Sequence, residues 1–435
     1  MPERTLQGPG SRTNGTKRVV FGAVLTLWPM AVAWANPATV DVFANTRYSD
    51  NIDKRGNNPE EDFVHRVGIG INKTTRPGTC EGALNGDVAF VTYQRGTNSD
   101  EVSGTVDANG VCEPNRNFRW SARDTLRDVR TTTRAPDSPA NRERRNVFAT
   151  GPTVTIYPGR RDNLSLDVEY QMTRFEESIE DDSDRVITTG RWQHLFSPRM
   201  NGGLAVSRSD IDYRQTEEEL IRDNANLFFS WQRPNGQWSG QAGYSWLESE
   251  QGILNNETNG FTGQLRYSHR WDAGTSAFGE IRRTITDVST DLDVRIPGLD
   301  LSLAETSSVV VTALTTGFSQ QWTERTSSDV TLSRTEQEYE RSGVTEERFV
   351  SDLGVSHRLT RHLSGRINTG YVREDFGDGR EQVDTVRGQL ALEYQCARDL
   401  SISVSTGHEN RYVVDGPGNE YDENWVQVGV RYNLR

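Results

Sequence analysis

The end of the chain alternates between apolar and polar residues with a period of two. Residues 426, 428, 430, 432 and 434 are Val, Val, Val, Tyr and Leu, and the residues between them are Gln427, Gly429, Arg431 and Asn433. Successive side chains of a β-strand point to opposite faces of its sheet. Segments 349–359 and 387–394 alternate in the same way. Strands of this kind need an apolar medium on one face and water on the other.

The alternating strands recur at a regular interval along the chain. Equivalent positions, each just before a tight polar turn, are separated by 37, 38, 51, 37 and 38 residues; they are His194, Trp231, His269, Gln320, His357 and Gln395. The longer interval contains an inserted segment around residues 291–300. Extending the repeat in both directions divides residues 36–435 into ten units of two strands. This predicts 20 strands, or 18 if segment 98–130, which is hard to parse, contributes fewer.

Short and long connections alternate between these strands. Short turns are expected at 197–199, 234–236, 272–274 and 397–399, whereas 176–184, 215–219 and 415–420 are longer and acidic. Short turns on the periplasmic side and longer loops outside are typical of bacterial outer-membrane barrels. A closed barrel also satisfies every backbone hydrogen bond in lipid. We therefore predict an all-β fold, a transmembrane antiparallel up-and-down β-barrel of 18–20 strands. A soluble β-solenoid or propeller is the alternative, but its repeat signatures are not seen.

Composition agrees with a sheet that faces water on one side. Apolar residues make up 33% of the chain, and the mean hydropathy is -0.72. Such values also occur in disordered chains, but those are poor in aromatic residues, and this chain has 10 Trp, 13 Tyr and 15 Phe. The formal net charge of -13 argues against nucleic acid as a partner.

The N-terminal segment has the features of an export signal. Lys17 and Arg18 precede an apolar run over 19–33, and Ala33 and Ala35 provide small residues at the -3 and -1 positions of a cleavage site. We therefore assign 1–35 to a cleavable signal peptide and 36–435 to the outer-membrane β-barrel. The alternative is a membrane-anchoring helix, for which the run is short and is interrupted by Pro29.

The sequence contains no motif that indicates catalysis or a cofactor. HExxH, GxSxG and GxxxxGK[ST] are all absent. His194, His269 and His357 recur at equivalent positions, where they could form a metal ring or could lie as polar-tipped rings at the membrane interface. We favour the interfacial interpretation, because the other equivalent positions are Trp231, Gln320 and Gln395. We expect no enzyme activity, no metal and no cofactor.

Cysteines and charged residues suggest structural roles. Cys80 and Cys112 lie one repeat apart, in turns that should be neighbours, and the periplasm is oxidising, so we predict a disulfide between them. The alternative is that both are free thiols, as Cys396 is expected to be.

Alternation places a set of charged residues in the lumen. They could form ladders of ion pairs that stiffen the wall, or an electrostatic field that selects solutes. The set is Arg266, Arg270, Glu280, Arg358, Arg366, Arg387, Glu393 and Arg431.

The last strand has the pattern by which barrels are recognised for insertion, carried by Gln427, Gly429, Tyr432 and Leu434.

The segment Val40–Ile52 and the hairpins that begin at His194 and His357 resemble the putative β-barrel porin family associated with exopolysaccharide loci. This resemblance implies an outer-membrane conduit for exopolysaccharide export. A general or nutrient-uptake porin and a closed structural barrel are the alternatives. The expected partners are outer-membrane lipid, lipopolysaccharide, the barrel-assembly machinery, polysaccharide and periplasmic export proteins.

Overall fold

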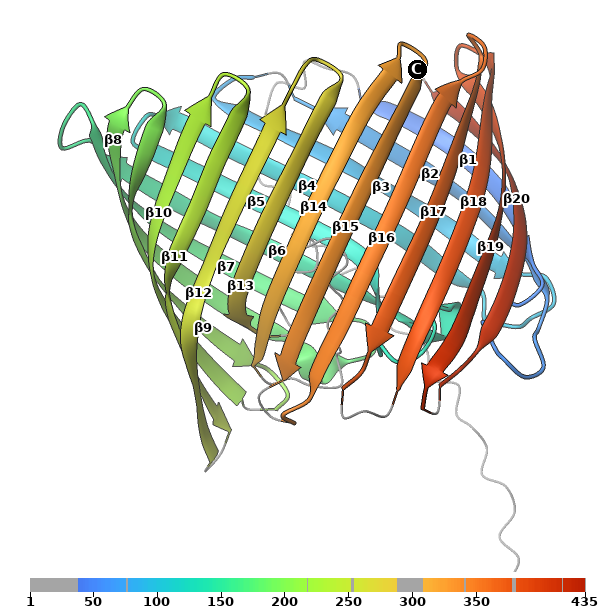
Figure 1. Ribbon diagram of the computed structural model, residues 1–435, viewed down its shortest axis with the longest axis horizontal. Coiled ribbons are helices and arrows are strands. Elements are labelled where there is room, and N and C mark those ends of the chain that lie inside the picture. Colours follow the sequence, from blue (N-terminus) through green and yellow to red (C-terminus); the bar gives the residue numbers. More distant parts are fainter. Residues whose placement is uncertain are drawn as a thin grey trace, which may run out of the picture. The chain divides into compact units, whose positions relative to one another are not determined.

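The computed structural model describes residues 38–75, 77–216, 218–251, 254–287, 308–339, 342–377, 381–416 and 418–434. The signal peptide assigned to 1–35 and the insertion expected around 291–300 both lie outside these residues. The described residues form one antiparallel sheet of twenty strands that closes on itself through pairing of β1 with β20 (Figure 1). The all-β barrel and its upper strand count are therefore confirmed.

The strands are long enough to cross a bilayer, which needs about 9–11 tilted residues. Their bounds are β1 Thr39–Ser49, β2 Asp62–Thr74, β3 Cys80–Tyr93, β4 Glu101–Asn115, β5 Phe118–Arg130, β6 Arg142–Ile156, β7 Asp162–Phe175, β8 Ser183–Ser197, β9 Met200–Tyr213, β10 Glu218–Arg233, β11 Gly236–Gln251, β12 Leu254–Arg270, β13 Thr275–Thr286, β14 Val309–Thr323, β15 Thr326–Tyr339, β16 Thr345–Arg358, β17 Leu363–Asp375, β18 Gln382–Ala397, β19 Leu400–Asp415 and β20 Tyr421–Leu434.

Each strand pairs with its neighbours in the chain, so the topology is up-and-down. The tight turns lie at one end of the barrel, along the upper rim in Figure 1, where the C-terminus also lies. We call this the short-turn end and the opposite end the loop end. Two single-turn 3-10 helices, Pro139–Asn141 and Ile179–Asp181, lie in loops of the loop end. No helix among the described residues has the length and hydropathy that a membrane-spanning helix requires.

The outer face of the wall is an apolar belt. On β18 the outward residues Val386, Leu390, Leu392 and Tyr394 are exposed, and on β20 the same holds for the alternating residues from Val426 to Leu434. Exposed aromatic side chains follow the short-turn rim on the same face; they include Trp192, Phe196, Trp271, Trp322 and Tyr394. Aromatic rings of this kind typically mark a membrane–water interface.

The recurring histidines lie among these rim aromatics. The ring of His194 contacts Phe196 at a centroid distance of 4.9 Å, and that of His269 contacts Trp271 at 4.7 Å. His194 Nδ1 lies 2.8 Å from an Asp162 carboxylate oxygen, which orients the ring. Among the described residues no group of His, Cys, Asp and Glu could hold a metal ion.

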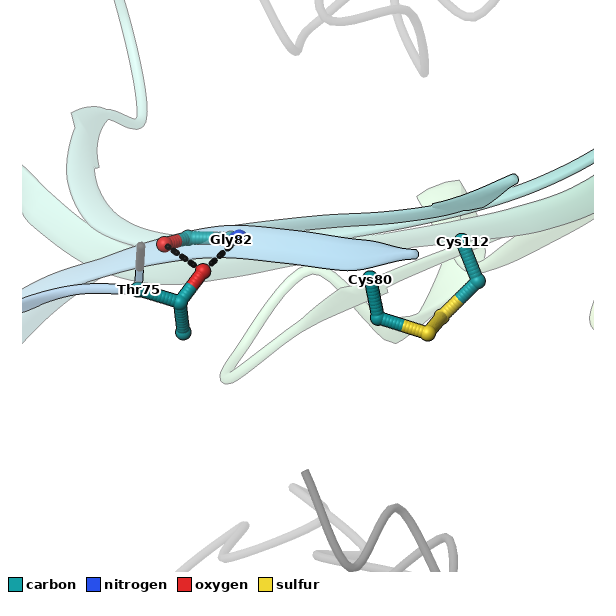
Figure 2. Close-up of a disulfide and its surroundings, with 4 residues drawn as sticks. All are labelled: Thr75, Cys80, Gly82 and Cys112. Carbon is teal, nitrogen blue, oxygen red and sulfur yellow. Dashed lines mark hydrogen bonds between the residues drawn. A yellow bond between two sulfur atoms is a disulfide. The ribbon is translucent and has the colours of Figure 1, made fainter. Parts of the chain in front are cut away.

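Cys80 and Cys112 face each other across the β3–β4 ladder and form a disulfide (Figure 2). Their Cα atoms are 4.0 Å apart. Beside them, Thr75 Oγ1 accepts a hydrogen bond from the Gly82 amide at 2.7 Å, which ties the β2–β3 turn to the start of β3. Both cysteines lie in strands and not in the turns to which the sequence assigned them, while Cys396, in β18, is an exposed free thiol.

We predict that unfolding without reductant leaves one thiol per chain open to alkylation, that of Cys396, and that prior reduction raises the number to three. Intact-mass spectrometry of the alkylated protein measures the number directly. Three alkylated thiols without reductant would show that Cys80 and Cys112 stay reduced. The Cys396→Ser variant, with an expected count of zero before reduction, is the control.

We also predict that Val404→Arg destabilises the folded barrel by about 2–4 kcal/mol, the cost of an arginine at the lipid-facing midplane. Val404 is 45% exposed on the outer face of β19, in the middle of the apolar belt. Urea unfolding in lipid vesicles measures the difference. The control is Ser405→Arg, one residue further along the strand and on the lumen face; an equal loss of stability in both variants would contradict the assignment of faces.

Candidate functional site: the lumen at the loop end

All eight lumen-lining residues expected from the sequence lie on the strand face opposite the exposed apolar belt. Five of them take part in four ion pairs along the wall: Arg266 with Glu280 at 2.8 Å, Arg387 with Asp352 at 2.7 Å, Arg431 with Asp41 at 3.2 Å and Arg366 with Asp329 at 3.4 Å. Glu280 is itself one of the eight. For Arg270, Arg358 and Glu393 no ion pair is found among the described residues.

Two of these pairs skip a strand, and a glycine makes room for each. Arg366 on β17 reaches Asp329 on β15 over Gly354 of β16, where an added Cβ would lie 2.8 Å from the carboxylate and 2.9 Å from the guanidinium. In the same way Arg387 on β18 reaches Asp352 on β16 over Gly370, where the Cβ would lie 2.4 Å from Arg387 Nε. These two ion pairs therefore join residues from alternate strands, because the intervening strand has a glycine, and so no side chain, at the crossing point.

The lumen changes character toward the loop end, because two ladders of the described wall stop before they reach it. Pairing of β4 with β5 ends at Val106–Leu126, and pairing of β12 with β13 ends at Gly263–Arg283. Beyond these points β5–β6 and β13–β14 lean into the lumen; Figure 1 shows β12 and β13 diverging toward the lower rim. We call the inward parts the first arm (127–144) and the second arm (the described residues 284–287 and 308–311).

The second arm is held mainly by apolar contacts and one buried ion pair. Ile285 and Val310, whose positions in their strands would otherwise face lipid, pack on the luminal side chains Ile211, Leu220 and Leu247 of β9, β10 and β11. Asp287 is fully buried, and both of its carboxylate oxygens lie 2.7 Å from Arg185 Nη2, whose side chain is 3% exposed. Tyr213 donates a further hydrogen bond to Asp287 at 3.0 Å.

The first arm is held by polar contacts on the opposite part of the wall. Arg130 at the end of β5 lies 3.3 Å from Glu374 of β17, which also binds Arg348 of β16 at 3.2 Å. Arg411 of β19 donates to the carbonyl oxygen of Arg134 in the β5–β6 loop at 3.0 Å. The contacts of Arg130 and Arg134 join residues more than 240 positions apart, so the arm spans the lumen to reach β17 and β19.

An arginine caps a free strand edge at each arm. Where β4 has lost its partner, Arg144 donates to the carbonyl oxygen of Val102. At the second arm Arg222 of β10 donates to the carbonyl oxygen of Ile285 at 2.9 Å. Buried backbone carbonyls need partners, and the guanidinium group replaces the strand that moved away.

The first arm and the wall enclose a charged chamber of about 560 Å³. The β1–β2 loop contributes Lys54, whose Nζ lies 2.7 Å from Glu409 and 3.8 Å from Glu423. Of the described residues that line the chamber, seven are basic and four are acidic; they are Lys54, Arg127, Arg130, Arg142, Arg348, Arg387 and Arg411, and Asp128, Asp137, Glu374 and Glu409. The excess of three positive charges favours anions in this part of the lumen.

Asp137 in the β5–β6 loop stays ionised at any physiological pH. Its partial burial raises the pKa, but two hydrogen bonds from Arg142, at 2.6 and 2.8 Å, outweigh this effect and hold the pKa at about 2. The stability that this pair contributes is therefore present above the ordinary carboxylate pKa and is lost only as the pH falls toward 2. Asp137 therefore keeps its negative charge over the range in which bacteria live.

Sequence reasoning identified Arg387 as lumen-lining but did not find the arms. Ile285 and Val310 have the same strand parity as the outward Ile281 and Leu314, yet both lie inside the barrel, because their strands leave the wall. The sequence signal was a run of turn-forming residues in the β5–β6 loop, just after the segment 98–130 that was hard to parse: Pro136, Asp137, Ser138 and Pro139.

Together, an apolar belt, a charged lumen and short turns at one end define a porin-like barrel of the outer-membrane type. Residues 300–434 match the family described as putative beta-barrel porin 2. For this part of the chain the match confirms the resemblance found in the sequence. No protein with a curated description shows significant sequence similarity to the chain.

Several solved barrels superpose loosely on the structure. The copper transporter OprC is 9% identical, with 92% of this chain and 81% of that chain covered and a TM-score of 0.45. The outer-membrane protein OpdK from Pseudomonas aeruginosa is 11% identical, with coverages of 92% and 99% and a TM-score of 0.40. The iron transporter FrpB from Neisseria meningitidis is 9% identical, with coverages of 92% and 83% and a TM-score of 0.46.

We predict that Asp287→Asn destabilises the barrel by about 3–5 kcal/mol, because it removes a buried carboxylate charge that is paired with the buried Arg185 guanidinium. Tyr213→Phe removes one hydrogen bond to the same carboxylate and should cost about 1 kcal/mol. Urea unfolding followed by tryptophan fluorescence measures both. Equal losses in the two variants would show that the ion pair does not anchor the second arm.

Proposed function

We propose that this barrel is a passive pore of the outer membrane and that its cargo is an exopolysaccharide on its way out of the cell. The observation that supports a pore most directly is the charged lumen wall of the short-turn half. There Arg366, Asp329 and Arg431 keep half or more of their side-chain surface open to solvent. A wall that served only to fill a closed barrel would bury such groups. The polysaccharide follows from the resemblance to the porin family found beside exopolysaccharide loci.

A second candidate cargo is a small anionic nutrient taken up from outside. The chamber favours this reading, since its 560 Å³ lies within the range of about 300–1,000 Å³ typical of small-molecule sites. The first arm also narrows the loop end, which an extended glycan would have to pass. The two cargoes differ in direction and size but share the same basic passage.

Single-channel recording of the refolded barrel in planar bilayers tests the pore. We expect stable openings, and in a potassium chloride gradient a reversal potential that indicates preference for chloride, because the chamber carries excess positive charge. Absence of openings from protein that still shows the heat-modifiable gel mobility of a folded barrel would mean a closed structural barrel.

Release of polysaccharide from a deletion strain distinguishes the cargoes. Loss of exopolysaccharide from the medium, restored by the wild-type gene, supports export. Normal release combined with slower growth on an anionic carbon source supports uptake.

A further inference from the structure

The chamber beside the first arm has the chemistry of a specific binding site and not only of a charged passage. Its cationic groups come from three separate parts of the chain: the β1–β2 loop, the first arm, and the wall strands β16, β18 and β19. They converge on one volume although they are far apart in sequence. An electrostatic field that merely attracts anions into the lumen does not need cationic groups gathered around one cavity.

Arg411 of the chamber has a buried donor that makes no hydrogen bond within the described part of the chain. Arg411 is 2% exposed, and its Nη2 donates to the carbonyl oxygen of Arg134, while Glu381 lies 4.0 Å away. Its Nε is buried and has no hydrogen-bond partner among the described residues. A buried guanidinium N–H without a partner is costly, and a bound anion would relieve the cost.

The acidic and hydroxyl groups of the lining narrow the class of ligand. Asp128 and Asp137 line the chamber next to the cationic groups, together with the hydroxyls of Thr105 and Thr385. A bare inorganic anion would be attracted by the cationic groups but would donate no hydrogen bond to these carboxylates. A ligand that carries both a carboxylate and hydroxyl groups could place the first on a guanidinium and donate hydrogen bonds from the second to the carboxylates.

We propose that the chamber binds the carboxylate of an acidic sugar, with Arg387 and Arg411 as its principal cationic contacts. This inference rests on the proposed function, because the ligand must reach the chamber through the lumen. The same chemistry is presented by a free sugar acid and by a uronic acid residue within a polysaccharide. A free sugar acid as the natural ligand would connect the site to uptake, and a polysaccharide would connect it to export.

Isothermal titration calorimetry of the full barrel folded in detergent tests the site with glucuronate, a glucuronate-containing oligosaccharide, glucose and sulfate as probes. We expect binding of glucuronate, of the oligosaccharide, or of both, and no heat from glucose. Binding of the oligosaccharide alone assigns the site to a glycan; binding of the free acid alone assigns it to a small solute. Sulfate binding as tight as glucuronate binding would overturn the role of the sugar hydroxyls.

The Arg387→Gln variant provides the residue-level test. Arg387 is about half exposed on the chamber wall, so its loss should leave the barrel folded. Loss of a charge-assisted hydrogen bond should weaken glucuronate binding about tenfold or more. The matched control is Arg366→Gln, an equally exposed luminal arginine paired with Asp329 and outside the chamber lining.

Unchanged affinity in Arg387→Gln, or an equal loss in Arg366→Gln, would overturn the assignment. Arg411→Gln is the second variant, to be used with a thermal-unfolding check because Arg411 is buried. The proposed pore and the proposed site can fail separately. Channel openings without ligand binding would support the pore and contradict the binding site. Ligand binding without channel openings would support the binding site and contradict the pore.

Discussion

The constraint on which this structure depends is that every backbone N–H and C=O group facing lipid must find its partner within the sheet. Pairing of β1 with β20 closes the ladder, so the wall has no exposed edge at membrane level. Closure also separates two environments, lipid outside and a polar lumen inside. The rest of the architecture follows from this separation, including the outward apolar belt and the inward charges.

The loop end shows what happens when that constraint is relaxed. On β12 the outward residues beyond Phe261 become polar, with Asn259 accepting a hydrogen bond from Tyr244. Near this level β12 and β13 separate, and the carbonyl edges that open are capped by arginines, as Arg222 caps Ile285. A guanidinium can replace a strand only where the site is shielded from lipid. The arms can therefore fold inward at the loop end, where they form the chamber.

The two arms are anchored by different physical forces. The second arm combines apolar packing with a fully buried ion pair, an arrangement that resists both water and salt. The first arm is held by largely buried ion pairs of Glu374 and by one backbone contact of Arg411, without an apolar cluster. The chamber lies against the arm whose position depends most on charge.

Much of this protein could be predicted from local sequence pattern. Alternation with a period of two indicated which residues of β18 and β20 face lipid, and the repeat of 37 or 38 residues limited the number of strands to 18–20 and indicated the pairing of neighbours. It also placed Cys80 opposite Cys112 and Arg387 in the lumen. These properties depend on a strand and its immediate neighbour, which the sequence records directly.

Only the tertiary structure decided where strands turn away from the barrel wall and which residues come into contact across the lumen. Ile285 and Val310 read as lipid-facing residues, yet they are buried against β9 to β11. Arg130 meets Glu374 through space, with no relation in the repeat. Pairings across a barrel depend on strand number, tilt and the path of loops, which no local pattern contains. The sequence thus determined the barrel, and the three-dimensional fold decided the shape and charge of its passage.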